Sequence, residues 1–251
     1  MKSKKPLIRW TIGPTNPEGF EILEHSVELM RTVYPEFDLM ICYNQIKNYQ
    51  IEKLKKMNVD LYDSSNDSES LSIHSERGYN VHQKLYPPRL RPDSHEIILD
   101  NDVIFFNRIR EIDCFLNDNK VLVCQGLNRL LGRYDEIIPA GIRVNSGIFG
   151  LPPYFDFSQE LEKKISLFEE KQWTNRFDEQ GLVAATLIDQ KQYYIIPLTS
   201  VVLVEPKWDY KIMTNKLACG YHFVGANYNK QHLGWLGYKE NNVKRKHYKF
   251  M

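Results

Sequence analysis

The sequence has few cysteines, no long apolar run and almost no net charge, and each absence excludes a class of protein. Its four cysteines form no Cys-x-x-Cys pair, which argues against a cysteine-rich zinc site and indicates a reducing compartment. No stretch approaches the ~20 apolar residues of a membrane-spanning helix. With 33 basic and 32 acidic residues, the formal charge of +1 gives no overall field that would favour a nucleic-acid partner. We therefore expect a soluble cytoplasmic protein that binds no nucleic acid.

Two further features are missing at the N-terminus and along the chain. The first ten residues are basic, but no apolar segment of about 7–15 residues follows them, so we expect no secretory signal. No period of about 20–50 residues repeats, which excludes a solenoid or a propeller. The chain does have 42% hydrophobic and 12% aromatic residues over its 251 positions, enough for a substantial core.

The N-terminal quarter alternates between two hydrophobic patterns. Short β-branched runs predict strands, and apolar residues at helical spacing predict helices between them. In chain order the expected elements are a strand at 7–12, a helix at 19–33, a strand at 37–43, a helix at 46–57 and a strand at 59–62. This order predicts an α/β domain with a parallel sheet.

Ligands of such sheets bind beyond the carboxyl ends of the strands. Thr11, Gly13 and Tyr43 lie at the ends of the first two expected strands. They are candidate walls of a nucleotide site, and the same positions equally suit ordinary turns.

An acidic pair interrupts the apolar run of residues 97–106. Asp100 and Asp102 flank Asn101, with apolar residues on both sides. Carboxylates in such a run are costly to bury unless a cation meets them. In an extended chain both would point to one side, where one divalent cation could bridge them to phosphate oxygens. The alternative is a tight Asp-Asn-Asp turn of a hairpin with both carboxylates in water.

Several polar features in the rest of the chain each allow two readings. Arg77 and Lys84 suit an anionic ligand such as a diphosphate, or a solvated basic face. Asn145, Ser146 and Gly147 interrupt an expected strand at 143–150, which indicates either a closely approaching ligand or a β-bulge.

The other polar features lie in the C-terminal half. Asp178 and Glu179 at the start of an expected helix complement its dipole. His222 is flanked by aromatic residues, as a packing histidine would be. Residues 243–251 are basic and resemble a peripheral tail that lies on an acidic surface or membrane.

In their order along the chain, these features resemble the GT-A-fold glycosyltransferases that use nucleotide-diphosphate sugars, most closely the glycogenin and lipopolysaccharide-galactosyltransferase group. The likeness runs from residue 7 to about residue 235. Four landmarks carry it: the α/β opening, the DxD motif Asp100-Asn101-Asp102, the segments Asn145-Ser146-Gly147 and Asp178-Glu179-Gln180, and the His-Phe-x-Gly motif His222-Phe223-Val224-Gly225. The sequence departs from the family's Lys-Pro-Trp, since residues 226–230 read ANYNK and Trp235 follows Gly234.

The resemblance implies a fold and a set of site residues. The fold is α/β, a single Rossmann-like mixed sheet flanked by helices, in a catalytic domain at 1–240 followed by a basic tail at 241–251. Mn²⁺ or Mg²⁺ would be held by Asp100, Asp102 and His222. The catalytic residues would be Asp178, Glu179 and Gln180. The donor would be bound by Thr11, Gly13, Tyr43, Arg77, Lys84, Asn101, Asn145, Ser146, Gly147, Gly225 and Lys230.

The resemblance also implies the reaction. A sugar would pass from a nucleotide-diphosphate sugar, with UDP favoured, to a hydroxyl of a glycan or glycolipid, and the basic tail could bring the protein to a membrane. An inverting enzyme would use Asp178 or Glu179 as general base, and a retaining enzyme needs none. The alternative is a sugar-nucleotide nucleotidyltransferase of the pyrophosphorylase type. Those enzymes have a glycine-rich loop after the first strand, where this chain has a single glycine in GPTNP.

Overall fold

The protein is described from a computed structural model. It covers residues 5–67, 84–169, 173, 175–190, 192–207, 217–226 and 231–248, with the backbone alone described from 241 onward. Arg77 and Lys230 lie outside the described residues, and so do the last three residues of the tail.

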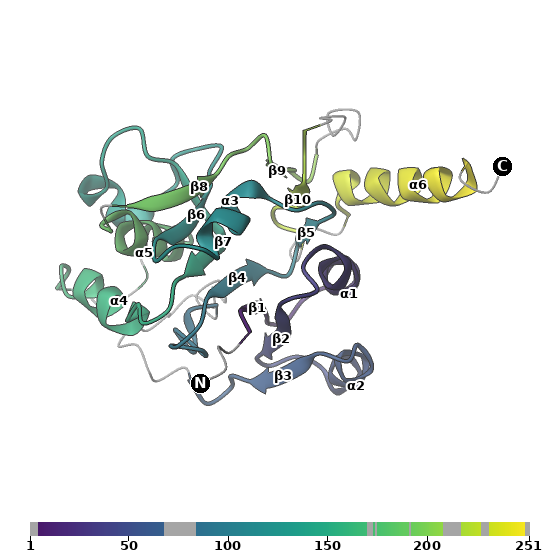
Figure 1. Ribbon diagram of the computed structural model, residues 1–251, viewed down its shortest axis with the longest axis horizontal. Helices are drawn as coiled ribbons and strands as arrows, with labels where there is room; N and C mark the ends of the chain where they lie inside the picture. The colour runs from purple at the N-terminus through teal and green to yellow at the C-terminus, as the bar shows by residue number, and fades with distance from the viewer. Residues whose placement is uncertain are drawn as a thin grey trace.

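A seven-stranded sheet in the order β3-β2-β1-β4-β7-β6-β8 forms the centre of the molecule (Figure 1). β7 runs antiparallel to its neighbours β4 and β6, and the other pairs are parallel, so the expected mixed sheet is confirmed. The strands are β1 (Leu7–Ile12), β2 (Asp38–Tyr43), β3 (Asp60–Asp63), β4 (Glu96–Asp100), β6 (Val121–Gln125), β7 (Val144–Leu151) and β8 (Tyr193–Ile196).

Helices cover both faces of this sheet. α1 and α3 pack on one face and α4 and α5 on the other, giving two separate apolar clusters. The helices are α1 (Pro17–Val33), α2 (Asn48–Lys56), α3 (Arg110–Phe115), the 3₁₀ helix η3 (Gly132–Ile137), α4 (Phe157–Ile165), α5 (Asp178–Ile188) and α6 (Leu233–Tyr248). α4 ends at Ile165, and the Ser166 hydroxyl just beyond it donates to the Lys163 carbonyl at 2.9 Å.

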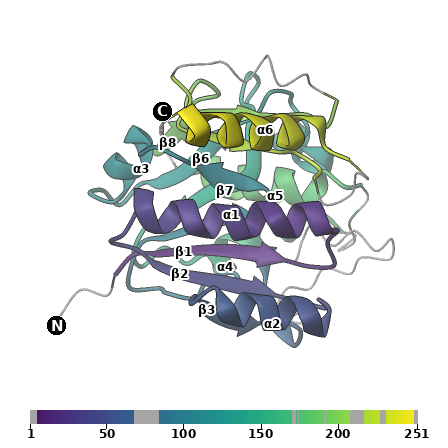
Figure 2. The ribbon, with the colours of Figure 1, turned by 90° about the vertical axis from the view of Figure 1, so that its right-hand side faces the viewer.

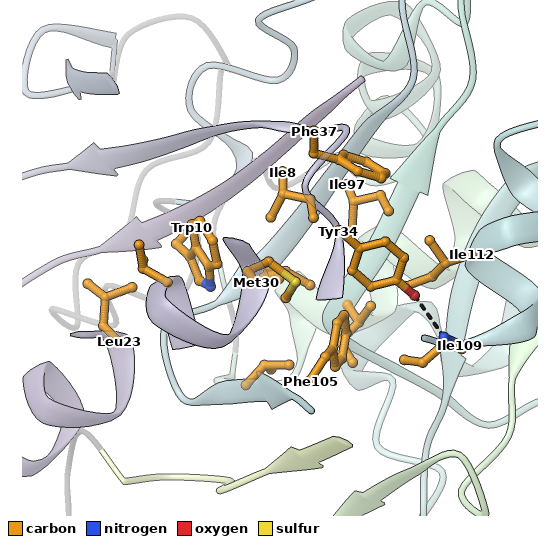
Figure 3. Packing of buried hydrophobic residues seen from close by; sticks show 14 of the residues in the cluster. Ile8, Trp10, Leu23, Met30, Tyr34, Phe37, Ile97, Phe105, Ile109 and Ile112 are labelled. Carbon is orange, nitrogen blue, oxygen red and sulfur yellow. Dashed lines mark hydrogen bonds between the residues drawn. The ribbon is translucent and has the colours of Figure 1, made fainter. Parts of the chain in front are cut away.

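α1 illustrates how the sequence specifies one of these helices. The Asn16 side chain accepts a hydrogen bond from the Gly19 N–H at 2.8 Å, and Pro17 occupies the first helical position, where no N–H is needed. Leu23 and Met30 lie on the face that packs against β1 and its Trp10 (Figure 3). The Trp10 indole donates to Ser26 of α1 at 3.1 Å. The cap and the apolar face together fix where α1 begins and how it lies on the sheet.

A second sheet of three strands, which the sequence analysis does not predict, lies beside the first. It consists of β5 (Val103–Phe105), β10 (Gly220–His222) and β9 (Val201–Leu203) in that order. β5 follows β4 after a two-residue turn, so the chain passes directly from one sheet to the other. This small sheet pairs His222 with Val103 and so brings the C-terminal part of the chain back to the end of β4.

Helix α6 lies beside α1 (Figure 2). Its Trp235 indole donates to Glu21 at 3.2 Å and its Lys239 pairs with the same carboxylate at 2.8 Å. α6 runs across residue 240, where the sequence analysis places the start of a separate tail, and that division stays a prediction. Among the described residues, no helix combines the length and apolar character needed to cross a membrane.

Candidate active site

Two carboxylates and an imidazole meet where the two sheets adjoin. Asp100 is the last residue of β4, Asp102 is the second residue of the turn that leads to β5, and His222 ends β10. The expected extended Asp-Asn-Asp stretch is therefore wrong, because Asn101 and Asp102 form a turn there. The hairpin alternative is wrong as well, since β4 and β5 belong to different sheets. The turn nonetheless directs both carboxylates toward His222.

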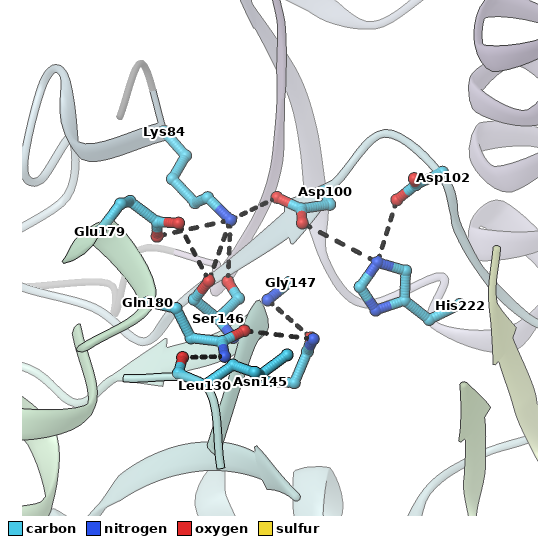
Figure 4. A network of polar contacts seen from close by, with 10 residues as sticks. All are labelled: Lys84, Asp100, Asp102, Leu130, Asn145, Ser146, Gly147, Glu179, Gln180 and His222. Carbon is cyan, nitrogen blue, oxygen red and sulfur yellow. Dashed lines mark hydrogen bonds and ion pairs between the residues drawn. The ribbon is translucent and has the colours of Figure 1, made fainter. Parts of the chain in front are cut away.

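The three side chains form a compact set of metal-ligand atoms (Figure 4). His222 Nε2 is 3.1 Å from Asp102 Oδ1 and 3.8 Å from Asp100 Oδ2, and one ligand atom from each residue lies within 4.8 Å of the others. Asp102 and His222 are buried. Apart from the contact between Asp102 Oδ1 and His222 Nε2, Asp102 Oδ1 and His222 Nδ1 have no hydrogen-bond partner among the described residues. Two carboxylates and one neutral imidazole are a donor set that fits a divalent cation such as Mn²⁺.

Gly147 on β7 lies directly against the side chains of this cluster. A Cβ atom at Gly147 would lie 2.3 Å from His222 Cε1 and 2.9 Å from Asp100 Oδ2. Only glycine therefore lets these side chains come this close to the strand. The β6–β7 register also shifts between Val123 and Cys124, an irregularity that agrees with the β-bulge alternative for this segment. The close approach at Gly147 is made by the side chains of the cluster itself.

A second polar network lies next to the metal-ligand cluster and centres on Lys84. The Lys84 ammonium is 2.7 Å from Asp100 Oδ1 and 3.5 Å from Glu179 Oε1, and it donates to Ser146 O and Oγ, each at 3.3 Å. The Ser146 hydroxyl donates to Glu179 Oε2 at 3.2 Å. Asp100 thus belongs to both groups, with one oxygen toward Lys84 and the other toward His222 (Figure 4).

Burial and charge act in opposite directions on the two central groups of this network. Burial raises the pKa of Glu179 to about 7, because the Lys84 ammonium offsets only part of the lost hydration and Asp100 adds repulsion. Burial alone would lower the pKa of Lys84, but Asp100 and Glu179 raise it above its ordinary value. Lys84 is therefore charged at neutral pH, while Glu179 titrates near it.

The raised pKa of Glu179 predicts a pH-dependent stability in the metal-free protein. Because the folded state binds this proton more tightly than the unfolded state, stability falls as pH rises from ~4.5 to ~7. Glu179→Gln removes the titration and keeps an acceptor for Ser146. Between pH 5 and pH 8 the free energy of unfolding of wild type should therefore fall by ~1–3 kcal/mol more than that of the variant. Urea denaturation at both pH values measures this, and equal pH slopes for the two proteins would contradict it.

Asn145 and Gln180 lie on the opposite side of Ser146 from Lys84. Asn145 Nδ2 donates to Gln180 Oε1 at 3.4 Å, and Asn145 Oδ1 accepts from the Gly147 N–H at 2.9 Å. Gln180 Nε2 donates to the Leu130 carbonyl at 2.7 Å. Both amides are partly accessible, so together with Leu130 they form a polar rim where hydroxyl groups of a sugar could bind.

Two of the predicted site residues have structural partners elsewhere. Asp178 is fully buried, and its two oxygens accept the backbone N–H groups of Arg133 at 2.8 Å and Asn175 at 3.0 Å. The buried Asn101 donates to the Gly19 carbonyl at 3.2 Å and so holds the acidic turn against α1. Both side chains help to position the site instead of joining the cluster around Lys84 and His222.

The predicted nucleotide walls lie at the carboxyl ends of the first strands. Thr11 on β1 is in register with Asp100 on β4, and Tyr43 is the last residue of β2. Gly13 follows β1 directly, and Gly225 takes a φ of +77° in the turn after His222. The strand order therefore brings Thr11 next to the acidic turn, as expected of a ligand site at this edge.

One pair of buried charges behind the site belongs to none of the predicted motifs. Arg9 Nε and Glu96 Oε1 are 2.7 Å apart, with both side chains fully buried. The available signal was a charged residue inside each of two apolar strands, LIRWTI and EIILD.

The architecture is the GT-A fold, which solved nucleotide-sugar glycosyltransferases share. The chain is similar to LgtC, solved as an active-site mutant, over 96% of this chain and 95% of that one, with 11% identity and a TM-score of 0.59. It is also similar to mouse xyloside xylosyltransferase 1, over 90% and 99% of the two chains with 12% identity and a TM-score of 0.54.

A third similar structure is the glycosyltransferase GlyE of Streptococcus pneumoniae. The match covers 95% of this chain and 60% of GlyE, with 14% identity and a TM-score of 0.57. No protein-family model matches the sequence, and no curated protein matches it significantly. At these identities the likeness establishes the fold alone.

Proposed function

We propose that the protein is a metal-dependent glycosyltransferase that moves a sugar from a nucleotide-diphosphate sugar to a hydroxyl group. The observation that carries this proposal is the Asp100, Asp102 and His222 cluster at the edge of a GT-A sheet, with the charged Lys84 beside it. Asp100, Asp102 and His222 would hold a divalent cation, and Lys84 nearby would add a second positive charge beside the diphosphate. A bound Mn²⁺ or Mg²⁺ would supply charge stabilisation for the departing diphosphate.

We assign the chain's own residues to three tasks. Lys84 would turn from Asp100 and Glu179 toward the diphosphate, where its ammonium stabilises the leaving group. Asn145 and Gln180 would hydrogen-bond sugar hydroxyls on the rim beside Leu130. Thr11, Gly13, Tyr43, Gly225 and, outside the described residues, Arg77 and Lys230 would surround the rest of the donor.

Asp178 and Glu179, the two carboxylates at the start of α5, would have different roles. Both oxygens of Asp178 already accept backbone N–H groups, so this residue is a poor general base. Glu179 is the carboxylate within the site, and its contacts with Lys84 and Ser146 favour a role in placing the lysine. This arrangement supports a retaining reaction, for which no general base is required.

The proposal predicts a metal-dependent response to one class of nucleotide. UDP, GDP, CDP and ADP are each added with and without Mn²⁺, and binding is followed by calorimetry and thermal shift. We expect one of them, with UDP favoured, to bind in the presence of Mn²⁺ only, and Asp102→Ala to weaken that binding at least ~100-fold. Asp156→Ala, an exposed carboxylate of a helix cap, is the matched control. The proposal fails if wild type binds none of the four.

The products separate this function from the nucleotidyltransferase alternative. Transfer, or slow hydrolysis of the donor, releases a nucleoside diphosphate. Incubation of a nucleotide sugar with pyrophosphate would instead release a nucleoside triphosphate if the alternative held. Anion-exchange chromatography of the two reactions distinguishes them.

We further propose that the acceptor is a glycan or glycolipid and that the basic end of the chain contacts an anionic membrane from the cytoplasmic side. Residues 243–251 read VKRKHYKFM, and Figure 1 shows the end of α6 extending beyond the rest of the molecule. Basic residues near an anionic surface contribute about 1 kcal/mol each. Deletion of residues 243–251 should therefore reduce binding to phosphatidylserine vesicles at least ~10-fold. Equal sedimentation of both proteins with these vesicles would refute the contact.

A further inference from the structure

The segment that carries Lys84 has little regular structure of its own. Between Lys84 and His95 the chain contains one short 3₁₀ turn and otherwise bends and turns before β4 begins. A segment of this kind has no helix or sheet ladder to satisfy its backbone groups, so its path depends on other partners. The position of the Lys84 ammonium, 2.7 Å from Asp100, depends in turn on that path.

The buried Arg9–Glu96 pair supplies three of these partners. Arg9 Nη2 donates to the Pro88 carbonyl at 3.2 Å. Glu96 Oε2 accepts the backbone N–H groups of Leu90 at 3.0 Å and Arg91 at 2.9 Å. One residue on β1 and one on β4 thus hold the backbone of the segment at three points from the interior of the sheet.

The rest of the connection to Lys84 is apolar and tightly packed. Leu85 and Tyr86 are 0% and 3% exposed and belong to the cluster beneath α4 and α5. Because packed interiors transmit displacements, a shift at Pro88 would reach Lys84 through these two buried residues.

A buried ion pair is weak evidence of a contribution to stability, since apolar residues of similar volume often replace such a pair without loss. Neighbouring positions of β1 and β4 are filled with fully buried isoleucine and leucine. A charged pair at this place therefore calls for a reason other than core packing.

We propose that Arg9 and Glu96 are positioning residues that hold Lys84 in reach of the diphosphate. This inference rests on the proposed function, because it takes Lys84 to be a ligand of the donor phosphates. According to this inference, two buried residues of β1 and β4 that do not contact the donor determine the position of the Lys84 side chain.

The test is a double-mutant cycle on the binding of a nucleoside diphosphate with Mn²⁺. Lys84→Met is compared with Arg9→Met/Glu96→Met and with the triple variant, using whichever of UDP, GDP, CDP and ADP binds wild type best. Without the charge-assisted hydrogen bond from Lys84, the diphosphate should bind ~10–100-fold more weakly. We expect the pair replacement to weaken binding by a similar factor, and Lys84→Met to add less than ~3-fold in the pair-replaced background.

Non-additivity of this kind is a result that a general loss of stability would not give. Ile112→Ala on α3, in the cluster on the other face of the sheet, serves as the control that lowers the melting temperature without touching the segment. Wild-type affinity in the folded pair-replaced protein, or fully additive losses, would overturn the proposal.

A second variant and the result for wild type alone complete the test. If Arg9→Met/Glu96→Met does not fold, the cycle is run with Arg9→Lys, which keeps a cation beside Glu96 but loses the donor to Pro88. Unchanged affinity in that variant overturns the proposal as well. If wild type binds none of the four nucleotides, both the proposed function and this inference are wrong. If Lys84→Met weakens nucleotide binding ~10–100-fold but replacement of Arg9 and Glu96 leaves the affinity unchanged, only this inference is wrong.

Discussion

Gly147→Ala is expected to weaken Mn²⁺ binding at least ~100-fold and to remove sugar transfer with it. The added Cβ would lie 2.3 Å from His222 Cε1 and 2.9 Å from Asp100 Oδ2, closer than real contacts allow. Because β7 lies inside the sheet, the strand cannot retreat, and the imidazole and the carboxylate must separate. Isothermal titration of the protein with Mn²⁺ measures the loss directly, without an identified acceptor.

Gly150→Ala is the matched control for this substitution. Gly150 lies on the same strand, but its added Cβ would meet the Phe115 ring at 2.9 Å, on the side of the α1 and α3 helices. The control should lose stability and keep its affinity for Mn²⁺. Wild-type affinity in folded Gly147→Ala would show that the three predicted ligands do not bind the ion together.

Asp178→Ala is expected to destabilise the protein by ~2–4 kcal/mol, because the fully buried carboxylate is lost and the N–H groups of Arg133 and Asn175 lose their acceptor. Folded molecules of the variant should bind Mn²⁺ and nucleotide within ~2-fold of wild type. Urea denaturation and calorimetry on one preparation measure both quantities.

The control for Asp178 is Asp156→Ala, which removes a single capping bond from the Gln159 N–H at an exposed helix start. That change should cost ~1 kcal/mol. Unchanged stability with lost transfer in Asp178→Ala would restore Asp178 as a catalytic residue and contradict its structural role.

The large sheet and the helices around it follow closely from hydrophobic patterns. β1 occupies the expected residues, and α1 begins two residues earlier than its apolar spacing predicts because Asn16 and Pro17 start it. The small sheet escaped prediction since its strands are only three residues long, too short for a period to be read. Its formation depends on pairing between distant parts of the chain.

Some residues of the candidate site can likewise be predicted from the sequence, and others depend on contacts between distant parts of the chain. The resemblance to known motifs placed Asp100, Asp102 and His222, which the structure brings together. It could not decide between Asp178 and Glu179, because successive helix positions point about 100° apart and only the surroundings of α5 determine which one faces the site. Arg9 and Glu96 belong to no motif, and their role depends on the path of an irregular segment.

The junction of the two sheets also determines when the site can exist. Asp100 and Asp102 leave the ribosome more than a hundred residues before His222, and β10 must then pair with β5 across that separation. Pairings of this kind form late in folding, after the local elements are in place. A nascent chain therefore presents two carboxylates without their imidazole partner, and the three proposed metal ligands can come together only after residue 222 has been synthesised.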